Sequence, residues 1–174
     1  MNKNSSYNRI FSCIENLLFP SNFRTKSAIN LFVSIIKVNI MTIIKEMLEN
    51  TKTIAVIGAK KDEWEYAYKV PLYMQQHDYM IFPVNPKFKG TELFGQNVID
   101  KVNHLIDPID MMLIFRRPEF LDEHAIEILQ MVPQPRYAWF QLGIYNDNAA
   151  KLLEDTGIKV VQNRCIMVEH ANLE

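Results

Sequence analysis

The stretch of 35 residues or so from position 53 to position 87 constrains the fold of this chain more than any other. The apolar run Thr53–Ile57 ends at Gly58, a helix-like segment follows, and a second apolar run ends at the sequence Asn85-Pro86-Lys87. Two short apolar runs separated by a helical segment are typical of a βαβ unit with parallel strands. Ligands of such sheets bind outside the carboxyl ends of the strands, where the strand order reverses. This stretch therefore predicts a nucleotide-like ligand at those ends.

The remainder of the chain continues the alternation of apolar runs and helical patterns. We expect strands at 53–57, 79–84, 110–115, 137–140 and 158–161. We expect helices at 42–50, 64–76, 118–131 and 146–155. Strands separated by helices of this length form a parallel sheet covered on both faces. The prediction is an α/β fold: a single Rossmann-like three-layer domain with a five-stranded, mainly parallel sheet.

Two prolines bear on these boundaries. Proline inside a helix costs about 3 kcal/mol, so the segment containing Pro71 is either one helix over 64–76 or a loop followed by a helix that starts near Val70. Pro83 falls in the second strand, and proline in sheets is confined to edges and strand ends. Pro83 therefore weakens the prediction of that strand.

Composition excludes several classes of protein. A net charge of −1 provides no field that would recruit nucleic acid or an anionic membrane. The two cysteines, Cys13 and Cys165, form no disulfide framework, which favours a reducing, cytoplasmic setting. The four histidines lack the paired spacing of metal ligands, so no metal is expected.

The first 40 residues differ from the rest of the chain. They contain five Lys or Arg and one acidic residue, whereas residues 41–174 contain fourteen and nineteen and all five glycines. The apolar stretch 28–36 comes too late for a secretory signal and is too interrupted by polar residues for a membrane span. We expect residues 1–40 to be a dispensable extension or an over-assigned start, and the domain to occupy 41–174. An amphipathic helix that packs on the domain or on a membrane surface is the alternative.

The loop after the first strand offers candidate phosphate ligands. Dinucleotide-binding proteins usually have three glycines there, so that a pyrophosphate can approach the backbone. This chain has only Gly58, followed by Ala59, Lys60 and Lys61. The missing glycines argue against a standard NAD dehydrogenase. The two lysines either supply charge for a phosphate or belong to a solvated loop.

The end of the second strand carries an amide and a cation. In NAD enzymes an acidic residue at this position holds the ribose 2′-hydroxyl. Here Asn85, Pro86 and Lys87 take its place. Lysine suits a phosphorylated ribose better than a free one, although a simple Asn-Pro turn is a common alternative.

Two further strand ends carry candidates. Arg116 and Arg117 follow the third strand and suit a pyrophosphate, unless one of them pairs with a nearby acid such as Glu119. The fourth strand ends in Phe140, Gln141, Leu142 and a glycine that permits a close approach of a ligand to backbone.

Cys165 is a candidate redox thiol. It follows the last strand directly after Arg164, and an adjacent arginine lowers a thiol pKa. A buried, inert cysteine is the alternative. The chain contains no nucleophile-elbow, Walker A or zinc-protease motif.

The quoted strand ends, taken together, resemble a known family. Five motifs occur in order: Ile54-Ala55-Val56-Ile57-Gly58, Pro83-Val84-Asn85-Pro86-Lys87, Phe115-Arg116-Arg117, Trp139-Phe140-Gln141-Leu142-Gly143 and Asn163-Arg164-Cys165. This pattern is similar to small stand-alone CoA-binding proteins, and to the CoA-binding domain of the succinyl-CoA synthetase alpha subunit. The resemblance covers roughly residues 48–170.

The resemblance implies a small-molecule ligand, coenzyme A or an acyl-CoA, bound across the strand ends. It places Lys87 near the ADP portion of the ligand, residues 59–62 in the phosphate loop, and residues 140–142 in the segment after the fourth strand. Two departures are the charged residues 60–62 and Met167, which stands where the family often has lysine.

The resemblance implies no catalytic residue and no membrane span, and it indicates no protein partner. The chain is therefore interpreted as a binding protein without catalysis of its own. The alternatives are an NAD(P)-dependent oxidoreductase and a thiol-redox protein that uses Cys165 with the CoA thiol.

Overall fold

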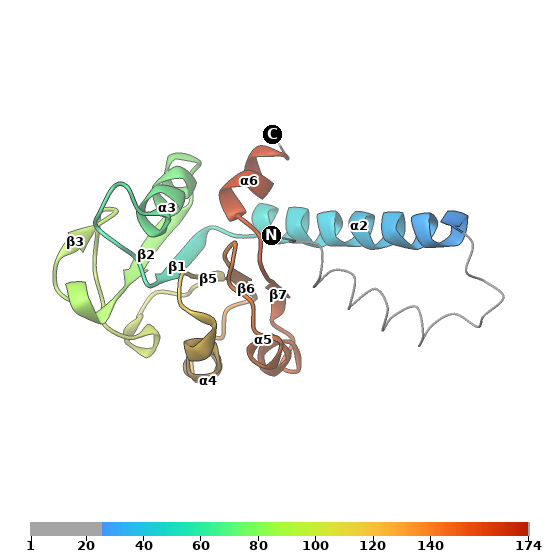
Figure 1. Ribbon diagram of the computed structural model, residues 1–174. Coiled ribbons are helices and arrows are strands. Elements are labelled where there is room, and N and C mark those ends of the chain that lie inside the picture. The colour runs from blue at the N-terminus through green and yellow to red at the C-terminus, as the bar shows by residue number, and fades with distance from the viewer. Residues whose placement is uncertain (1–25, 174) are drawn as a thin grey trace. The chain divides into compact units, whose positions relative to one another are not determined.

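A five-stranded parallel sheet forms the centre of the domain (Figure 1). The computed structural model describes residues 26–173. The strands are β1 (Thr53–Ile57), β2 (Met80–Val84), β5 (Met111–Ile114), β6 (Tyr137–Phe140) and β7 (Lys159–Val161). Their order in the sheet is β2-β1-β5-β6-β7, and every neighbouring pair is parallel. The predicted α/β class and five-stranded sheet are confirmed.

Helices cover both faces of this sheet. They are α2 (Lys26–Glu49), α3 (Tyr66–Gln76), α4 (Leu121–Leu129), α5 (Asp147–Glu154) and α6 (Ile166–Ala171). Figure 1 shows α3 and α6 on one side of the sheet and α4 and α5 on the other, which gives the expected three layers. Short 3₁₀ turns are η2 (Pro86–Phe88), η3 (Val102–His104) and η4 (Pro118–Phe120).

Three elements were not expected from the sequence. The polar segment after β2 contains a small antiparallel pair, β3 (Glu92–Leu93) and β4 (Gln96–Asn97), and α6 follows the last strand. These elements are too short for their hydrophobic pattern to exceed that of a loop.

The prolines take different positions. Pro83 does not prevent the strand: it lies in β2, an edge strand of the sheet, where proline is tolerated, and Val84 beside it makes a parallel bridge to Ile99. Pro71 lies inside α3, which begins at Tyr66, so the shorter helix starting near Val70 is wrong. The interior proline is tolerated because the carbonyl oxygen of Ala67, to which Pro71 has no N–H to donate, accepts a hydrogen bond from the N–H of Lys60.

The helix before β1 is longer than predicted. The sequence indicated 42–50, whereas α2 begins at Lys26 because its helical pattern continues upstream without a glycine or proline. Packing divides the chain into residues up to Ile43 and residues from Ile44 on. In the second unit Ile44, Met47 and Leu48 are buried. Among the described residues, no helix has the length and apolarity needed to cross a bilayer.

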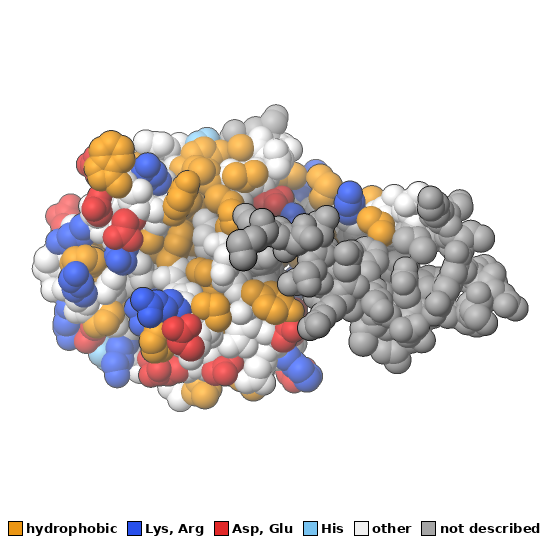
Figure 2. Space-filling model, in the orientation of Figure 1, with side chains coloured by type: hydrophobic (Ala, Val, Ile, Leu, Met, Phe, Trp, Pro, Cys, Tyr) orange, Lys and Arg blue, Asp and Glu red, His pale blue; other side chains and the backbone are white. Residues whose placement is uncertain are grey.

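Strand residues fill the core because a parallel sheet is covered on both faces. All four residues of β5 and all four of β6 are buried. Side chains of opposite charge are interspersed on the face shown in Figure 2, as the net charge of −1 suggests.

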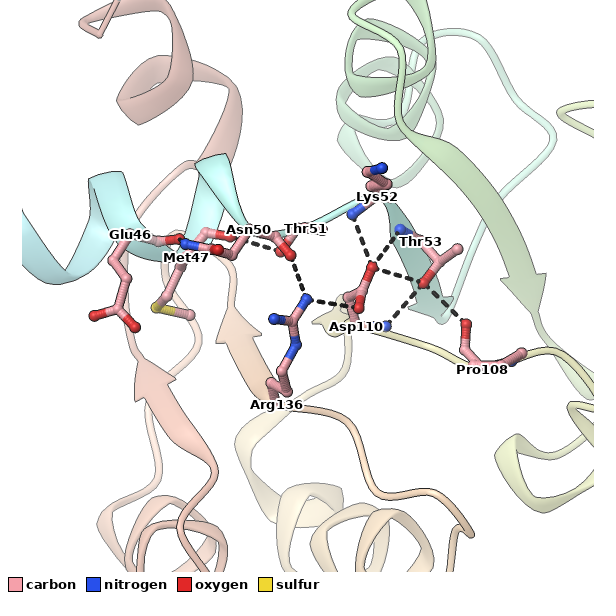
Figure 3. A network of polar contacts seen from close by, with 9 residues as sticks. All are labelled: Glu46, Met47, Asn50, Thr51, Lys52, Thr53, Pro108, Asp110 and Arg136. Carbon is pink, nitrogen blue, oxygen red and sulfur yellow. Dashed lines mark hydrogen bonds and ion pairs between the residues drawn. The ribbon is translucent and has the colours of Figure 1, made fainter.

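A polar network joins the amino ends of the strands, at the edge opposite to the predicted site (Figure 3). Asp110 Oδ2 accepts hydrogen bonds from the backbone N–H groups of Lys52 (2.8 Å) and Thr53 (3.1 Å). Asp110 Oδ1 accepts one from Arg136 Nη2 (2.8 Å), which also donates to the carbonyl oxygen of Asn50. The network ties the end of α2 to β1, β5 and β6.

The same contacts set the ionisation of Asp110. Partial burial opposes the charged form, but the hydrogen bonds from Lys52, Thr53 and Arg136 outweigh it and hold the pKa of the carboxyl below its usual value. Asp110 is therefore a charged anchor of the fold.

Candidate functional site

A groove of about 740 Å³ crosses the carboxyl ends of β1, β5 and β6. The strand order reverses between β1 and β5, since the chain runs outward from β1 to β2 and returns to β5 on the other side. Open α/β sheets bind ligands at such a point. The groove is lined by Gly58, Lys60, Trp64, Glu65, Tyr66, Ala67, Phe115, Arg116, Arg117, Pro118, Phe120, Gly143 and Ile144.

Gly58 stands where β1 ends against β5. Its φ is +88°, a region that side chains disfavour, and a Cβ atom there would lie 2.5 Å from the carbonyl oxygen of Phe115. Its N–H donates to the carbonyl oxygen of Val84 in β2 at 2.9 Å. Glycine therefore lets three strand ends meet closely at the floor of the groove.

The loop after Gly58 is fixed by the interior proline of α3. Pro71 has no N–H, so the carbonyl oxygen of Ala67, four residues earlier, loses its helical partner. The backbone N–H of Lys60 donates to that oxygen at 3.3 Å. This bond joins the loop after β1 to α3. The Lys60 ammonium pairs with Glu65 at 3.3 Å.

Lys61 and Lys87, predicted from separate motifs, converge on one ring. The two ammonium groups lie 5.4 Å and 5.5 Å from the centroid of the Phe88 ring. Cation–π contacts of this kind hold flexible lysine side chains near one another. Two positive charges therefore gather between the loop after β1 and the turn after β2.

Asn85 also joins the loop after β1 to the turn after β2. It is buried, and its Nδ2 donates to the carbonyl oxygen of Ala59 at 2.7 Å, while its Oδ1 accepts from the N–H of Lys87 at 3.0 Å. The Asn85 amide thus bonds to protein through both of its polar atoms. It orients the loop after β1 and η2. Pro86 opens η2 and is exposed.

Arg116 divides the groove from a smaller cavity of about 210 Å³, since its side chain lines both. Its guanidinium lies 5.2 Å from the centroid of the Phe120 ring. Within the described part of the chain its buried Nε has no hydrogen-bond partner. Arg117 is 81% exposed, with Glu119 3.9 Å away.

The smaller cavity contains a histidine that the sequence analysis did not single out. Nδ1 of His124 lies 2.9 Å from a carboxylate oxygen of Glu127, and both side chains line the cavity with Arg116. The buried Nε2 of His124 has no partner among the described residues. A lone histidine on a helix gives no sequence signal for such a position.

The segment after β6 divides between core and surface. Phe140 is buried in the core, and Gln141 is buried with its Oε1 accepting from the N–H of Ile166 at 3.0 Å. Leu142 is 65% exposed. Of these three candidates, only Leu142 presents its side chain at the surface, beside the groove residues Gly143 and Ile144.

Cys165 lies at the amino end of α6 and is partly buried. Its sulfur accepts a hydrogen bond from Nε2 of Gln141 at 3.6 Å. The guanidinium of Arg164 pairs instead with Glu169 at 2.7 Å. The other cysteine, Cys13, lies outside the described residues.

Two aromatic groove residues were missed by the sequence analysis. Trp64 and Tyr66 line the groove and are 83% and 70% exposed. The helical pattern placed both in one helix over 64–76, whereas Trp64 precedes α3 and Tyr66 is its first residue. An exposed aromatic pair beside a glycine-ended strand was the available signal. Among residues 26–173, no group of side chains could hold a metal ion.

The fold defines a Rossmann-like α/β protein with a groove at the carboxyl ends of its strands. The family model of the CoA binding domain matches residues 52–171. The chain therefore belongs to the CoA-binding domain family, as the resemblance implied.

Relatives support this membership. The uncharacterized protein YneT of Bacillus subtilis (strain 168) is 35% identical over 128 residues, which cover 74% of this chain and 92% of YneT. Cell-free ID.343 of Thermus thermophilus is 40% identical with a TM-score of 0.73, covering 77% of this chain and 98% of that one.

A more distant neighbour shares the fold alone. Acetyl-coenzyme A synthetase 1 of Ca. Korarchaeum cryptofilum is 20% identical with a TM-score of 0.58. The match covers 68% of this chain and 27% of the synthetase.

Proposed function

We propose that the protein binds coenzyme A or an acyl-CoA across the carboxyl ends of β2, β1, β5 and β6, without catalysis of its own. The observation that carries this proposal is the gathering of four cations at these ends in a chain of the CoA-binding domain family. Lys61 and Lys87 lie at the β1 and β2 ends, and Arg116 and Arg117 follow β5.

The distribution of charge suggests how the nucleotide lies. A 3′-phosphate is held between Lys61 and Lys87, where the two ammonium groups share the Phe88 ring. The pyrophosphate lies over Gly58, within reach of Arg116. The buried, unpartnered Nε of Arg116 fits this assignment, because an unsatisfied donor costs about 1–3 kcal/mol until a partner arrives.

NAD is a weaker candidate. The position at the end of β2 that would hold a ribose hydroxyl in an NAD enzyme is occupied by Asn85, whose amide is engaged with Ala59 and Lys87. A thiol-redox role is also less well supported, because the guanidinium of Arg164 is paired with Glu169.

Calorimetry with CoA, acetyl-CoA, dephospho-CoA, NAD and NADP tests the proposal. We expect CoA and acetyl-CoA to bind more tightly than either dinucleotide. Native mass spectrometry of the purified full chain, with a search for a co-purified nucleotide, provides an independent check. Tighter binding of NAD or NADP than of CoA would contradict the proposal and favour the oxidoreductase alternative.

A further inference from the structure

Between β2 and β6, the cations at the carboxyl edge of the sheet follow β2, β1 and β5 but not β6. Going along the sheet from β2 to β6, the strand ends carry Lys87, then Lys61, then Arg116 and Arg117. The segment after β6 carries instead Leu142 and Ile144, with Gly143 between them. The ends of β2, β1 and β5 therefore suit phosphates, and the segment that follows β6 is apolar.

The opposite wall of the groove is aromatic. Trp64 and Tyr66, from the turn that enters α3, line the same groove as Ile144. Both rings are largely exposed, although monomeric proteins usually bury such rings. Among the described residues that line this wall, Lys60 and Glu65 lie 3.3 Å apart and neutralise each other, and the exposed Lys69 ammonium lies 5.3 Å from the centroid of the Trp64 ring.

We infer that the β6 half of the groove binds the apolar acyl group of an acyl-CoA, in contact with Trp64, Tyr66 and Ile144. This inference rests on the proposed function, because the nucleotide over β2, β1 and β5 directs the other end of the ligand toward β6. The preferred ligand class is then a CoA thioester of an unbranched apolar acid. Free CoA and thioesters ending in a carboxylate bind less tightly.

The physical reason is the burial of apolar area. A fully buried methylene contributes about 0.8 kcal/mol, which is about a fourfold gain in affinity. Because the groove is open on one side, we expect about a twofold gain for each methylene. A terminal carboxylate would lose hydration against the rings. The cation over the Trp64 ring, Lys69, is exposed to water, so pairing with it would offset little of that loss.

The test uses the full chain and a series of ligands: CoA, acetyl-CoA, butanoyl-CoA, hexanoyl-CoA, octanoyl-CoA and succinyl-CoA. We expect the Kd to fall steadily from acetyl-CoA to octanoyl-CoA, by roughly sixtyfold in total over the six added methylenes. Succinyl-CoA, which matches butanoyl-CoA in carbon number, should bind more weakly than butanoyl-CoA.

Trp64 provides a direct optical signal. The chain has two tryptophans, and the other, Trp139, is fully buried. Octanoyl-CoA should shift the emission of Trp64 to shorter wavelength, whereas CoA should leave it nearly unchanged. Trp64→Phe should lose this shift and keep most of the chain-length preference, and Trp64→Ala should lose much of that preference.

Ile106→Ala is the matched control for an exposed apolar side chain. Ile106 is almost fully exposed, on the loop that leads to the amino end of β5, away from the groove. This variant should keep the wild-type preference.

The outcomes separate the two proposals. Equal affinity for CoA and for every acyl-CoA, with no shift in Trp64 emission, would overturn the acyl inference and leave CoA binding intact. Tighter binding of succinyl-CoA than of butanoyl-CoA would also overturn it and would assign Arg117 to a carboxylate. Failure of every member of the series to bind would contradict the proposed function itself.

Discussion

Gly58 and Phe115 approach so closely that a Cβ atom at position 58 would lie 2.5 Å from the carbonyl oxygen of Phe115. This contact is between the carboxyl ends of β1 and β5, at the reversal of strand order. The two ends can form the floor of one groove only while residue 58 has no side chain.

Gly58→Ala should therefore destabilise the protein and weaken ligand binding. The positive φ alone costs an alanine about 1–2 kcal/mol, and the contact with Phe115 adds to that. Gly157→Ala is the matched control, because its φ of +94° is similar and nothing lies within 4 Å of its Cβ position. Urea unfolding of both variants gives the difference that is due to the contact. Equal destabilisation would mean that β5 moves away without cost.

Lys87→Ala should weaken CoA much more than dephospho-CoA. A hydrogen bond to a charged group contributes about 1.5–3 kcal/mol, which corresponds to a loss of roughly tenfold or more in affinity. Calorimetry with both ligands measures the difference. Lys89→Ala is the control, since Lys89 is bound to Asp100 at 2.8 Å. Equal losses for both ligands would assign Lys87 to another phosphate or to the fold.

Asp110→Asn should lower stability at neutral pH. Asparagine keeps the shape of the side chain but points an N–H group at N–H donors from which Asp110 now accepts hydrogen bonds. The free energy of unfolding should therefore fall by about 1.5–3 kcal/mol. Asp155→Asn is the control, because Asp155 pairs only with the exposed Lys151 across one helical turn. Urea unfolding at pH 7 compares the two.

The contribution of Asp110 also depends on pH in a defined direction. The folded pKa is lower than the unfolded value of about 3.9. The stabilisation is therefore fully present above the unfolded pKa, and it is lost as the pH falls through the folded pKa. The stability gap between wild type and Asp110→Asn should narrow below about pH 3.9. A gap that stays constant down to pH 2 or so would show that the charge is not involved.

We propose that the domain begins near Met41, and a chain starting there should fold. Ile44, Met47 and Leu48, which are buried, remain in such a chain. Its melting temperature and its affinity for CoA should equal those of the full chain. A melting temperature lower by many degrees would mean that residues before Met41 are part of the stable structure.

The sequence by itself determined the layers and the strand ends of this protein. Alternation of apolar runs and helical segments has a fixed physical consequence, since parallel strands need crossovers and covered faces. Gly58, Lys87 and Arg116 could therefore be assigned to one edge of a sheet before any coordinates were known.

Only the tertiary structure decided what each strand-end residue does. Asn85 and Gln141 looked like ligand contacts, but their amides are bonded to backbone groups of Ala59, Lys87 and Ile166. Pro71 looked like a helix start, but it lies inside α3. Proline has no N–H to donate to the carbonyl oxygen of Ala67, and the N–H of Lys60, eleven residues upstream of Pro71, donates to that oxygen instead. Hydrogen-bond partners distant in sequence leave no periodic pattern, so the division between residues that build the site and residues that face a ligand appears only when the chain is folded.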